Sequence, residues 1–142
     1  LRFIMNMKTQ TILAAIALLV LPLSAQEPTV PDFSKGMPDV KLEKREKIDG
    51  NETFHLKTAL GSKELSPTLS KFLGAGWGTR KLNREEMILA ANEGRTSNAE
   101  VYLAVYENAR IPGVDIRVIH LKHKEGYAGS GVKITVIRKE KG

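Results

Sequence analysis

The feature that most constrains this chain is an uninterrupted apolar run near its N-terminus, at residues 12–21. Lys8 supplies a positive charge before the run, Pro22 ends it, and Ala25 is a small residue at which a cut can fall. These three parts together predict a secretory signal peptide over residues 1–25. The run has 10 residues, whereas a bilayer-spanning helix takes about 20, so we expect no permanent membrane span after cleavage.

The predicted initiator is Met7 or Met5, and the residues before it are then an overhang. A signal of this kind predicts that the protein works outside the cytoplasm, and the absence of cysteine favours a bacterial periplasmic or secreted protein. A cut after Ala25 leaves 117 of the 142 residues, and none of them is cysteine. This length suffices for one domain, which disulfides cannot stabilise and which must therefore fold by burial alone.

Residues 26–39 contain three prolines and a glycine and show almost no periodic apolar pattern. This composition predicts an extended linker, followed by a single globular domain over residues 40–140. The domain is expected to begin with strands at residues 40–48 and 53–60, joined by a turn that starts at Asp49 and Gly50. The first strand is heavily charged, which indicates an edge position in the sheet.

Two short helices are expected next. Ser66, followed by proline, predicts the start of the first helix, and Gly74 predicts its end. Asn83 and Glu86 have the spacing of a capping box at the start of the second helix, and Gly94 is expected to end it. The buried side of this helix is expected to consist of Met87, Ile88, Ala90 and Ala91.

The last third of the chain predicts a three-stranded antiparallel meander at residues 100–107, 114–124 and 132–138, because apolar residues alternate along each segment. A helix is the alternative for the first of these segments, since Ser97 and Glu100 could cap one. The predicted fold class is α+β, with two short helices packed on a mostly antiparallel sheet of about five strands.

The strand from Val114 has two apolar phases. Ile116 and Val118 share the parity of Val114, while Ile119 and Leu121 have the other. A β-bulge near Val118 and Ile119 would place all of these residues on one face. The basic side chains of this strand and of the following one would then share the outer face: Arg117, His120, Lys122, Lys124 and Lys133.

This basic face predicts an anion-binding surface. Residues 117–142 hold seven Lys/Arg and two Glu, a net charge of +5. Such a local positive field favours an anionic envelope component as partner, either a glycan, a lipid headgroup or an acidic protein. The alternative is a solvated basic face that only discourages aggregation.

Trp77 and Tyr127 are candidate members of a ligand platform, since both lie in glycine-rich segments. The segment 74–81 follows a predicted helix and lacks a Gly-Lys-Ser/Thr step, so it is not expected to bind phosphate as a nucleotide loop does. His120 and His123 are three residues apart and would diverge on a strand, so we expect no metal site. No cofactor is expected.

The sequence therefore predicts a non-catalytic binding or accessory domain that recognises an anionic envelope ligand and binds no nucleic acid. One alternative is a small exported enzyme with a histidine base near Trp77, either His55, His120 or His123. Another is an envelope assembly or structural factor that pairs residues 40–48 with a partner strand. The sequence leaves the oligomeric state open.

Overall fold

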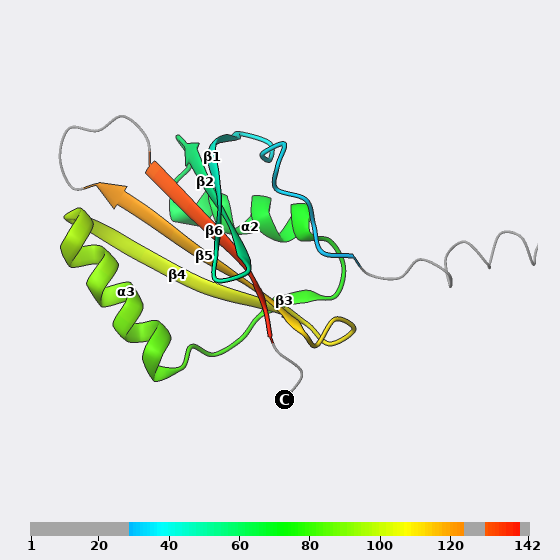
Figure 1. The fold of residues 1–142 in the computed structure, drawn as a ribbon. Helices are drawn as coiled ribbons and strands as arrows, with labels where there is room; N and C mark the ends of the chain where they lie inside the picture. Colours follow the sequence, from blue (N-terminus) through cyan, green and yellow to red (C-terminus); the bar gives the residue numbers. More distant parts are fainter. Residues whose placement is uncertain (1–28, 124–129, 140–142) are drawn as a thin grey trace, which may run out of the picture.

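A computed structural model describes residues 29–123 and 130–139 of the chain (Figure 1). The α+β prediction is confirmed, with a six-stranded sheet in place of about five strands. The additional strand is the three-residue β3. In chain order the elements are β1 (Val40–Ile48), β2 (Asn51–Thr58), α2 (Ser62–Leu73), β3 (Trp77–Thr79), α3 (Arg84–Ser97), β4 (Ala99–Asn108), β5 (Val114–His123) and β6 (Ser130–Arg138).

The strand order across the sheet is β1-β2-β6-β5-β4-β3, and every neighbouring pair is antiparallel. The segment 100–107 is a strand, not a helix, and the predicted meander is present as β4, β5 and β6. β6 lies between β2 and β5, so it joins the N-terminal hairpin to the rest of the sheet (Figure 1).

Each face of the sheet has its own helix and its own apolar cluster. Leu65, Leu69 and Leu73 of α2 pack against the larger cluster, and we call that side the α2 face. Leu89 and Ala90 of α3 pack against a smaller cluster on the opposite side, the α3 face, made by Leu103, Val105 and Ile119. Because side chains alternate between the faces along each strand, the register places every sheet residue on one face or the other.

The β1–β2 hairpin turns at Asp49 and Gly50, whose φ angles of 51° and 81° are both positive. Two positive φ angles are typical of the two-residue turn that matches the twist of a hairpin. The predicted edge position of the charged first strand is confirmed, since β1 is outermost. Its register with β2 shifts between Leu42 and Lys44, which leaves Glu43 as a bulge.

The β-bulge predicted in β5 near Val118 is wrong, since β5 keeps one register with β4 and one with β6 along its length. Val118 faces the larger cluster, as do Val114 and Ile116. Ile119 and Leu121 face the smaller one. The two apolar phases exist because β5 is an interior strand whose two faces are both buried, as is common for strands with cover on both sides.

Both helices differ from the predictions at one end. α2 begins at Ser62, four residues before the predicted cap at Ser66, and contains Pro67 inside its second turn. α3 has the predicted capping box at Asn83 but continues through Gly94 to Ser97. It ends at Asn98, which adopts the left-handed conformation with φ 47° and so performs the role expected of a C-terminal glycine.

Gly94 lies inside α3 at the point where the helix packs against β4. A Cβ atom at Gly94 would lie 3.2 Å from Val101 Cγ2 and 3.3 Å from the Ala99 carbonyl oxygen, so a larger residue would require β4 to shift by a few tenths of an ångström. The buried side predicted for α3 is wrong for Met87 and Ile88, whose side chains are 53% and 50% exposed, and for the exposed Ala91, but correct for Ala90. In α3 the residues that pack inward are Leu89 and Ala90, next to Leu82 just before the helix.

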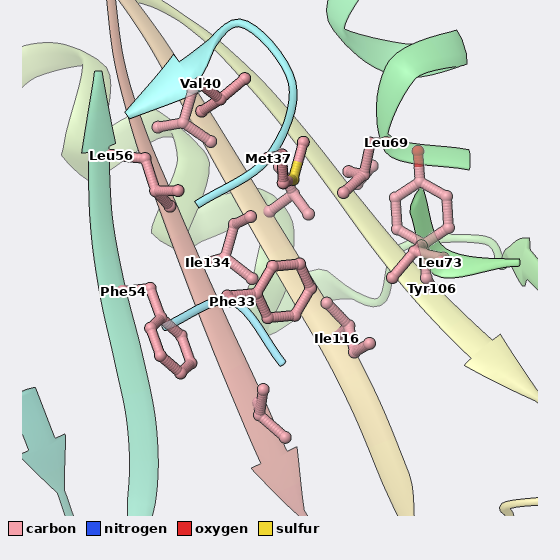
Figure 2. Packing of buried hydrophobic residues seen from close by; sticks show 14 of the residues in the cluster. Phe33, Met37, Val40, Phe54, Leu56, Leu69, Leu73, Tyr106, Ile116 and Ile134 are labelled. Atoms are coloured by element: carbon pink, nitrogen blue, oxygen red, sulfur yellow. The ribbon is translucent and has the colours of Figure 1, made fainter. Parts of the chain in front are cut away.

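Part of the predicted linker belongs to the folded domain. The Phe33 side chain is fully buried, with its ring centroid 5.6 Å from that of Phe54 and 5.4 Å from that of Phe72. Met37 packs in the same cluster (Figure 2). The start of the folded domain, predicted at residue 40, therefore lies earlier in the chain. Apolar side chains of the preceding segment belong to the core although they follow no periodic pattern.

The predicted signal peptide and residues 26–28 lie outside the described residues, so export stays a prediction. Among residues 29–123 and 130–139, no helix is long and apolar enough to cross a membrane.

Candidate functional site

The structure divides four of the five predicted anion-binding residues between the two faces of the sheet. Arg117 and Lys133 lie on the α3 face, because they pair with Thr135 and Ile119. His120 and Lys122 have the opposite parity and lie on the α2 face. Lys124 falls outside the described residues. The single outward face expected from a bulge in β5 does not form, although binding of an anion stays a prediction.

On the α3 face, acidic side chains of α3 lie close to both cations. Lys133 Nζ is 2.6 Å from Glu93 Oε1. The Arg117 guanidinium is half-buried, and desolvation lowers its pKa below the usual value although Glu86 and Glu93 oppose the shift. Lys133 is therefore paired within the protein, whereas Arg117 takes part in no ion pair among the described residues and is attracted only at longer range by Glu86 and Glu93. Its burial makes Arg117 a poor candidate for capturing a ligand.

The histidines do not form a common site. His120 is 1% exposed, and its Nδ1 lies 3.1 Å from Ser62 Oγ. Burial, with a smaller effect of nearby Lys122, lowers the pKa of His120 and favours the neutral imidazole. His55 lies on the opposite face, with Nε2 2.9 Å from Glu46 Oε2. The hypothesis of convergent imidazoles therefore has no support from His55 and His120, and the side chain of His123 is outside the described part.

Trp77 is not an exposed ring on which a ligand could stack. It begins β3 and packs, half-buried, against the larger apolar cluster. Tyr127, its predicted companion, lies outside the described residues. In the described part of the chain, no group of three or more His, Asp or Glu side chains could hold a metal ion.

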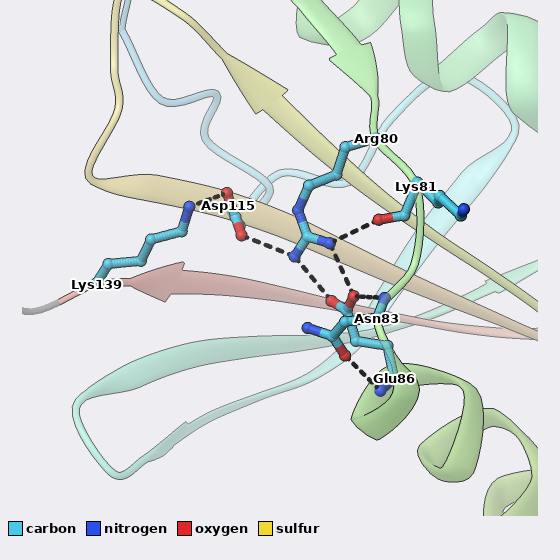
Figure 3. A network of polar contacts seen from close by, with 6 residues as sticks. All are labelled: Arg80, Lys81, Asn83, Glu86, Asp115 and Lys139. Atoms are coloured by element: carbon cyan, nitrogen blue, oxygen red, sulfur yellow. Dashed lines mark hydrogen bonds and ion pairs between the residues drawn. The ribbon is translucent and has the colours of Figure 1, made fainter.

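A charged network on the α3 face is fully paired (Figure 3). The Arg80 guanidinium donates to both carboxylate oxygens of Glu86, at 2.8 Å each, and to Asp115 Oδ2 at 3.0 Å. Asp115 Oδ1 also lies 2.9 Å from Lys139 Nζ. Arg80 holds the pKa of Glu86 below its usual value. The network fixes the start of α3 to β5, and we assign it a structural role.

A basic surface does exist, on strands other than the predicted ones. The register places five basic side chains on the α3 face of β1, β2 and β6: Lys41, Lys44, His55, Lys57 and Lys133. Glu46 pairs with two of them, Lys44 and His55. Only Lys41 and Lys57 take part in none of the ion pairs within the described residues.

Lys41 and Lys57 are directly opposite each other in the β1–β2 pair. Like charges at opposite positions of an antiparallel pair repel and destabilise the hairpin. On its other side Lys57 pairs with Gly131 of β6, which has no side chain to shield it. The free protein therefore contains an unfavourable pair of charges that a bound anion would relieve.

These two lysines border an open hollow of about 620 Å³ at the end of the hairpin. We call it the lysine-rimmed hollow, and its lining is Lys35, Met37, Asp39, Val40, Lys41, Lys57, Thr58 and Ala59. Lys35 adds a third cation that forms no ion pair within the described part. The exposed Ala59 and the aliphatic stems of the lysines provide apolar surface beside the charges, while Met37 and Val40 at the wall are largely buried, so the hollow combines positive charge with some apolar contact.

A tight turn before β1 builds one wall of the hollow. Met37 and Val40 exchange two backbone hydrogen bonds of 3.0 Å, and Asp39 between them has a φ angle of 63°. The Asp39 carbonyl accepts a 2.8 Å hydrogen bond from Thr58 Oγ1, which ties the turn to the end of β2. Gly36 has a φ angle of 71°, and a Cβ there would lie 2.7 Å from the Val40 carbonyl oxygen.

No protein-family model, curated protein or solved structure matches this chain. The function is therefore inferred from the geometry and chemistry of the lysine-rimmed hollow.

Proposed function

We propose that the protein is a non-catalytic binding module that recognises an anionic amphiphile in the lysine-rimmed hollow. The ligand carries a phosphate or carboxylate next to an apolar portion, and a lipid headgroup of the bacterial envelope has this chemistry. The observation that carries the proposal is the opposed pair of Lys41 and Lys57, which lacks an acidic neighbour within ion-pair distance in the described part.

Charge and shape support this ligand class. A phosphate between Lys41 and Lys57 would replace repulsion with two attractive contacts, and Lys35 could supply a third. Met37 and Val40 lie at the wall of the same hollow, but their side chains are only 8% and 3% exposed, so the apolar contact would come mainly from the exposed Ala59 and from the aliphatic stems of the lysines. A purely polar anion would leave these apolar atoms unused, so we favour a lipid over a soluble glycan.

The predicted export signal is compatible with this function, since it would bring the hollow to the envelope. We accordingly propose a periplasmic or secreted protein. Its positive surface would also favour encounter with anionic membranes through long-range attraction, which falls as ionic strength rises.

Vesicle co-sedimentation tests the proposal. The protein, purified from cells that express the full chain, is mixed with vesicles of an anionic phospholipid or of a zwitterionic one. We expect binding to the anionic vesicles only, weakened by added salt and abolished in the double variant Lys41→Gln with Lys57→Gln. A soluble anionic glycan serves as competitor, and displacement by it alone would identify a glycan site instead of a lipid site.

The matched control is the double variant Lys63→Gln with Lys71→Gln, which removes the same charge from exposed positions on α2. If net charge alone attracts the protein to vesicles, both double variants will lose binding equally, and the hollow is then not the site. Equal binding by the wild type and by the Lys41 and Lys57 variant would also overturn the proposal.

A further inference from the structure

The outer side of β4 is largely unpaired. Its neighbour β3 covers only Tyr106–Asn108, because Trp77–Thr79 has three residues. The Arg80 amide then donates to the Val105 carbonyl oxygen at 3.0 Å, and the chain leaves the sheet toward α3. Between Ala99 and Val105, β4 has no strand partner on this side within the described residues.

The direction of the free backbone groups follows from that last hydrogen bond. In an antiparallel sheet, alternate residues direct both their N–H and C=O groups to the same side. Since the Val105 carbonyl points away from β5 toward Arg80, the backbone groups of Leu103 and Val101 point outward too. Ala99 belongs to the same set, but its carbonyl oxygen lies beside Gly94 of α3. The accessible edge therefore consists of Val101 and Leu103.

The two edges of the sheet differ in protection. β1, with sequence VKLEKREKI, is mostly charged and contains the bulge at Glu43. Charged side chains and bulges are the usual means by which monomeric proteins prevent strand pairing at an edge. The free part of β4 has only Glu100 among apolar and aromatic neighbours. Because β1 is charged and bulged and the free part of β4 is not, β4 is a better candidate for strand addition than residues 40–48.

Exposed apolar side chains occur on the two elements that border this edge. Of the four large hydrophobic residues most exposed in the described part, Met87, Ile88 and Tyr102 belong to α3 and β4, and Tyr102 is 42% exposed. An open groove of about 500 Å³ follows the edge, lined by Ala90, Ala91, Gly94, Arg95, Asn98, Ala99 and Val101. The small side chains leave room for an approaching element next to α3.

We propose that this edge pairs with the same edge of a second copy of the chain, antiparallel and about a two-fold axis. The register that uses only the accessible residues places Val101 opposite the second copy's Leu103. Each of these residues then donates one N–H and accepts through one C=O. Tyr102 lies opposite the second copy's Tyr102, and such cross-strand aromatic pairs stabilise sheets.

Charge complementarity favours a second copy as the occupant. The two-fold axis brings the two α3 helices side by side and antiparallel on one face of the joined sheet. α3 has Glu85 in its first turn and Arg95 in its last, so the two-fold axis places Glu85 of each helix toward Arg95 of the other, and Arg84 beside Glu85 offsets part of this attraction. The opposed helix dipoles also attract. Closed two-fold pairing of one patch with itself is the commonest way in which soluble proteins assemble.

Cysteine cross-linking tests the register, because the chain has no cysteine of its own. Tyr102→Cys places two thiols at a non-hydrogen-bonded pair, with Cα atoms about 4.5 Å apart, within the range that a disulfide bridges. We expect a covalent dimer under mild oxidation. The control is Ile48→Cys, which replaces a side chain 53% exposed on the opposite edge strand and should remain monomeric.

Sedimentation velocity of the full chain gives the second measurement. We expect a concentration-dependent dimer in the wild type and a monomer with Ala91→Lys, because Ala91 lines the groove and its side chain is exposed. Circular dichroism of the variant should match that of the wild type. A wild-type protein that is monomeric at all concentrations, or a Tyr102→Cys variant that cross-links no faster than Ile48→Cys, overturns the proposal. No lipid takes part in either measurement, so its outcome is independent of the proposed ligand site.

Discussion

The opposed lysines of the hairpin make a prediction in which stability and binding change in opposite directions. Lys57→Glu converts the repulsion with Lys41 into an attraction across the β1–β2 pair. The variant should therefore be more stable than the wild type, while the lysine-rimmed hollow loses its ligand. A residue that only stabilises the fold would lower stability when replaced.

The size of the effect follows from the register. Opposite side chains on an antiparallel pair have Cβ atoms about 5 Å apart, and two unit charges about 6 Å apart in water repel by about 0.7 kcal/mol. Lys57→Gln removes this term, and Lys57→Glu also reverses its sign. After partial screening by salt, we expect a total gain of about 1 kcal/mol in the free energy of unfolding, or about 3–5 °C in the melting temperature for a domain of this size.

Thermal and urea unfolding of four proteins would measure this: the wild type, Lys57→Gln, Lys57→Glu and the double variant Lys41→Glu with Lys57→Glu. Stability should rise in steps over the first three and then fall back in the double variant, because two carboxylates repel as two ammonium groups do. The differences should shrink at high salt. If Lys57→Glu is no more stable than Lys57→Gln, or if the double variant keeps the full gain, the lysines do not interact as inferred.

Two further predictions concern buried polar groups. Arg80→Met leaves the carboxylates of Glu86 and Asp115 without their shared cation. The variant should lose about 2–3 kcal/mol of unfolding free energy, measured by urea titration, and Arg80→Lys should lose less. Unchanged stability would contradict the structural role assigned to Arg80. Burial lowers the pKa of His120, so the unfolded chain, which titrates at about 6.5, binds the proton more tightly than the folded protein. The contribution of neutral His120 to stability is therefore fully present above the unfolded pKa and is lost as the pH falls from there toward the folded pKa. His120→Gln should flatten this part of the profile of melting temperature against pH. An unchanged slope would refute the inference that His120 is buried in its neutral form.

Local sequence signals predicted much of the fold correctly. The capping box of α3, the turn at Asp49 and Gly50, and the meander formed by β4, β5 and β6 each depend on neighbouring residues, and the structure has them all. The errors occur where tertiary contacts decide. Phe33 has no periodic apolar neighbours, yet it fills the space between Phe54 and Phe72.

The candidate site could not be predicted for a similar reason. A regular hairpin that turns at Asp49 and Gly50 would pair Lys41 with Thr58. The bulge at Glu43 shifts the register by one residue and brings Lys41 opposite Lys57. The sequence places most of the positive charge near the C-terminus, but β5 is interior and α3 supplies acidic partners there. The basic surface without such partners is therefore on the N-terminal hairpin.

The position of β6 has a consequence for the order in which the sheet can be completed. β6 follows β5 in the chain, yet it lies between β2 and β5 in the sheet. During synthesis, the hairpin of β1 and β2 and the pair of β4 and β5 can each form early, but no strand connects them until β6 emerges. Contacts of such long sequence separation form late and slow folding. The hollow between the N-terminal turn and the end of β2 is thus expected to gain the support of β6 only after Ser130–Arg138 has been synthesised, and until then the sheet stays divided into two parts.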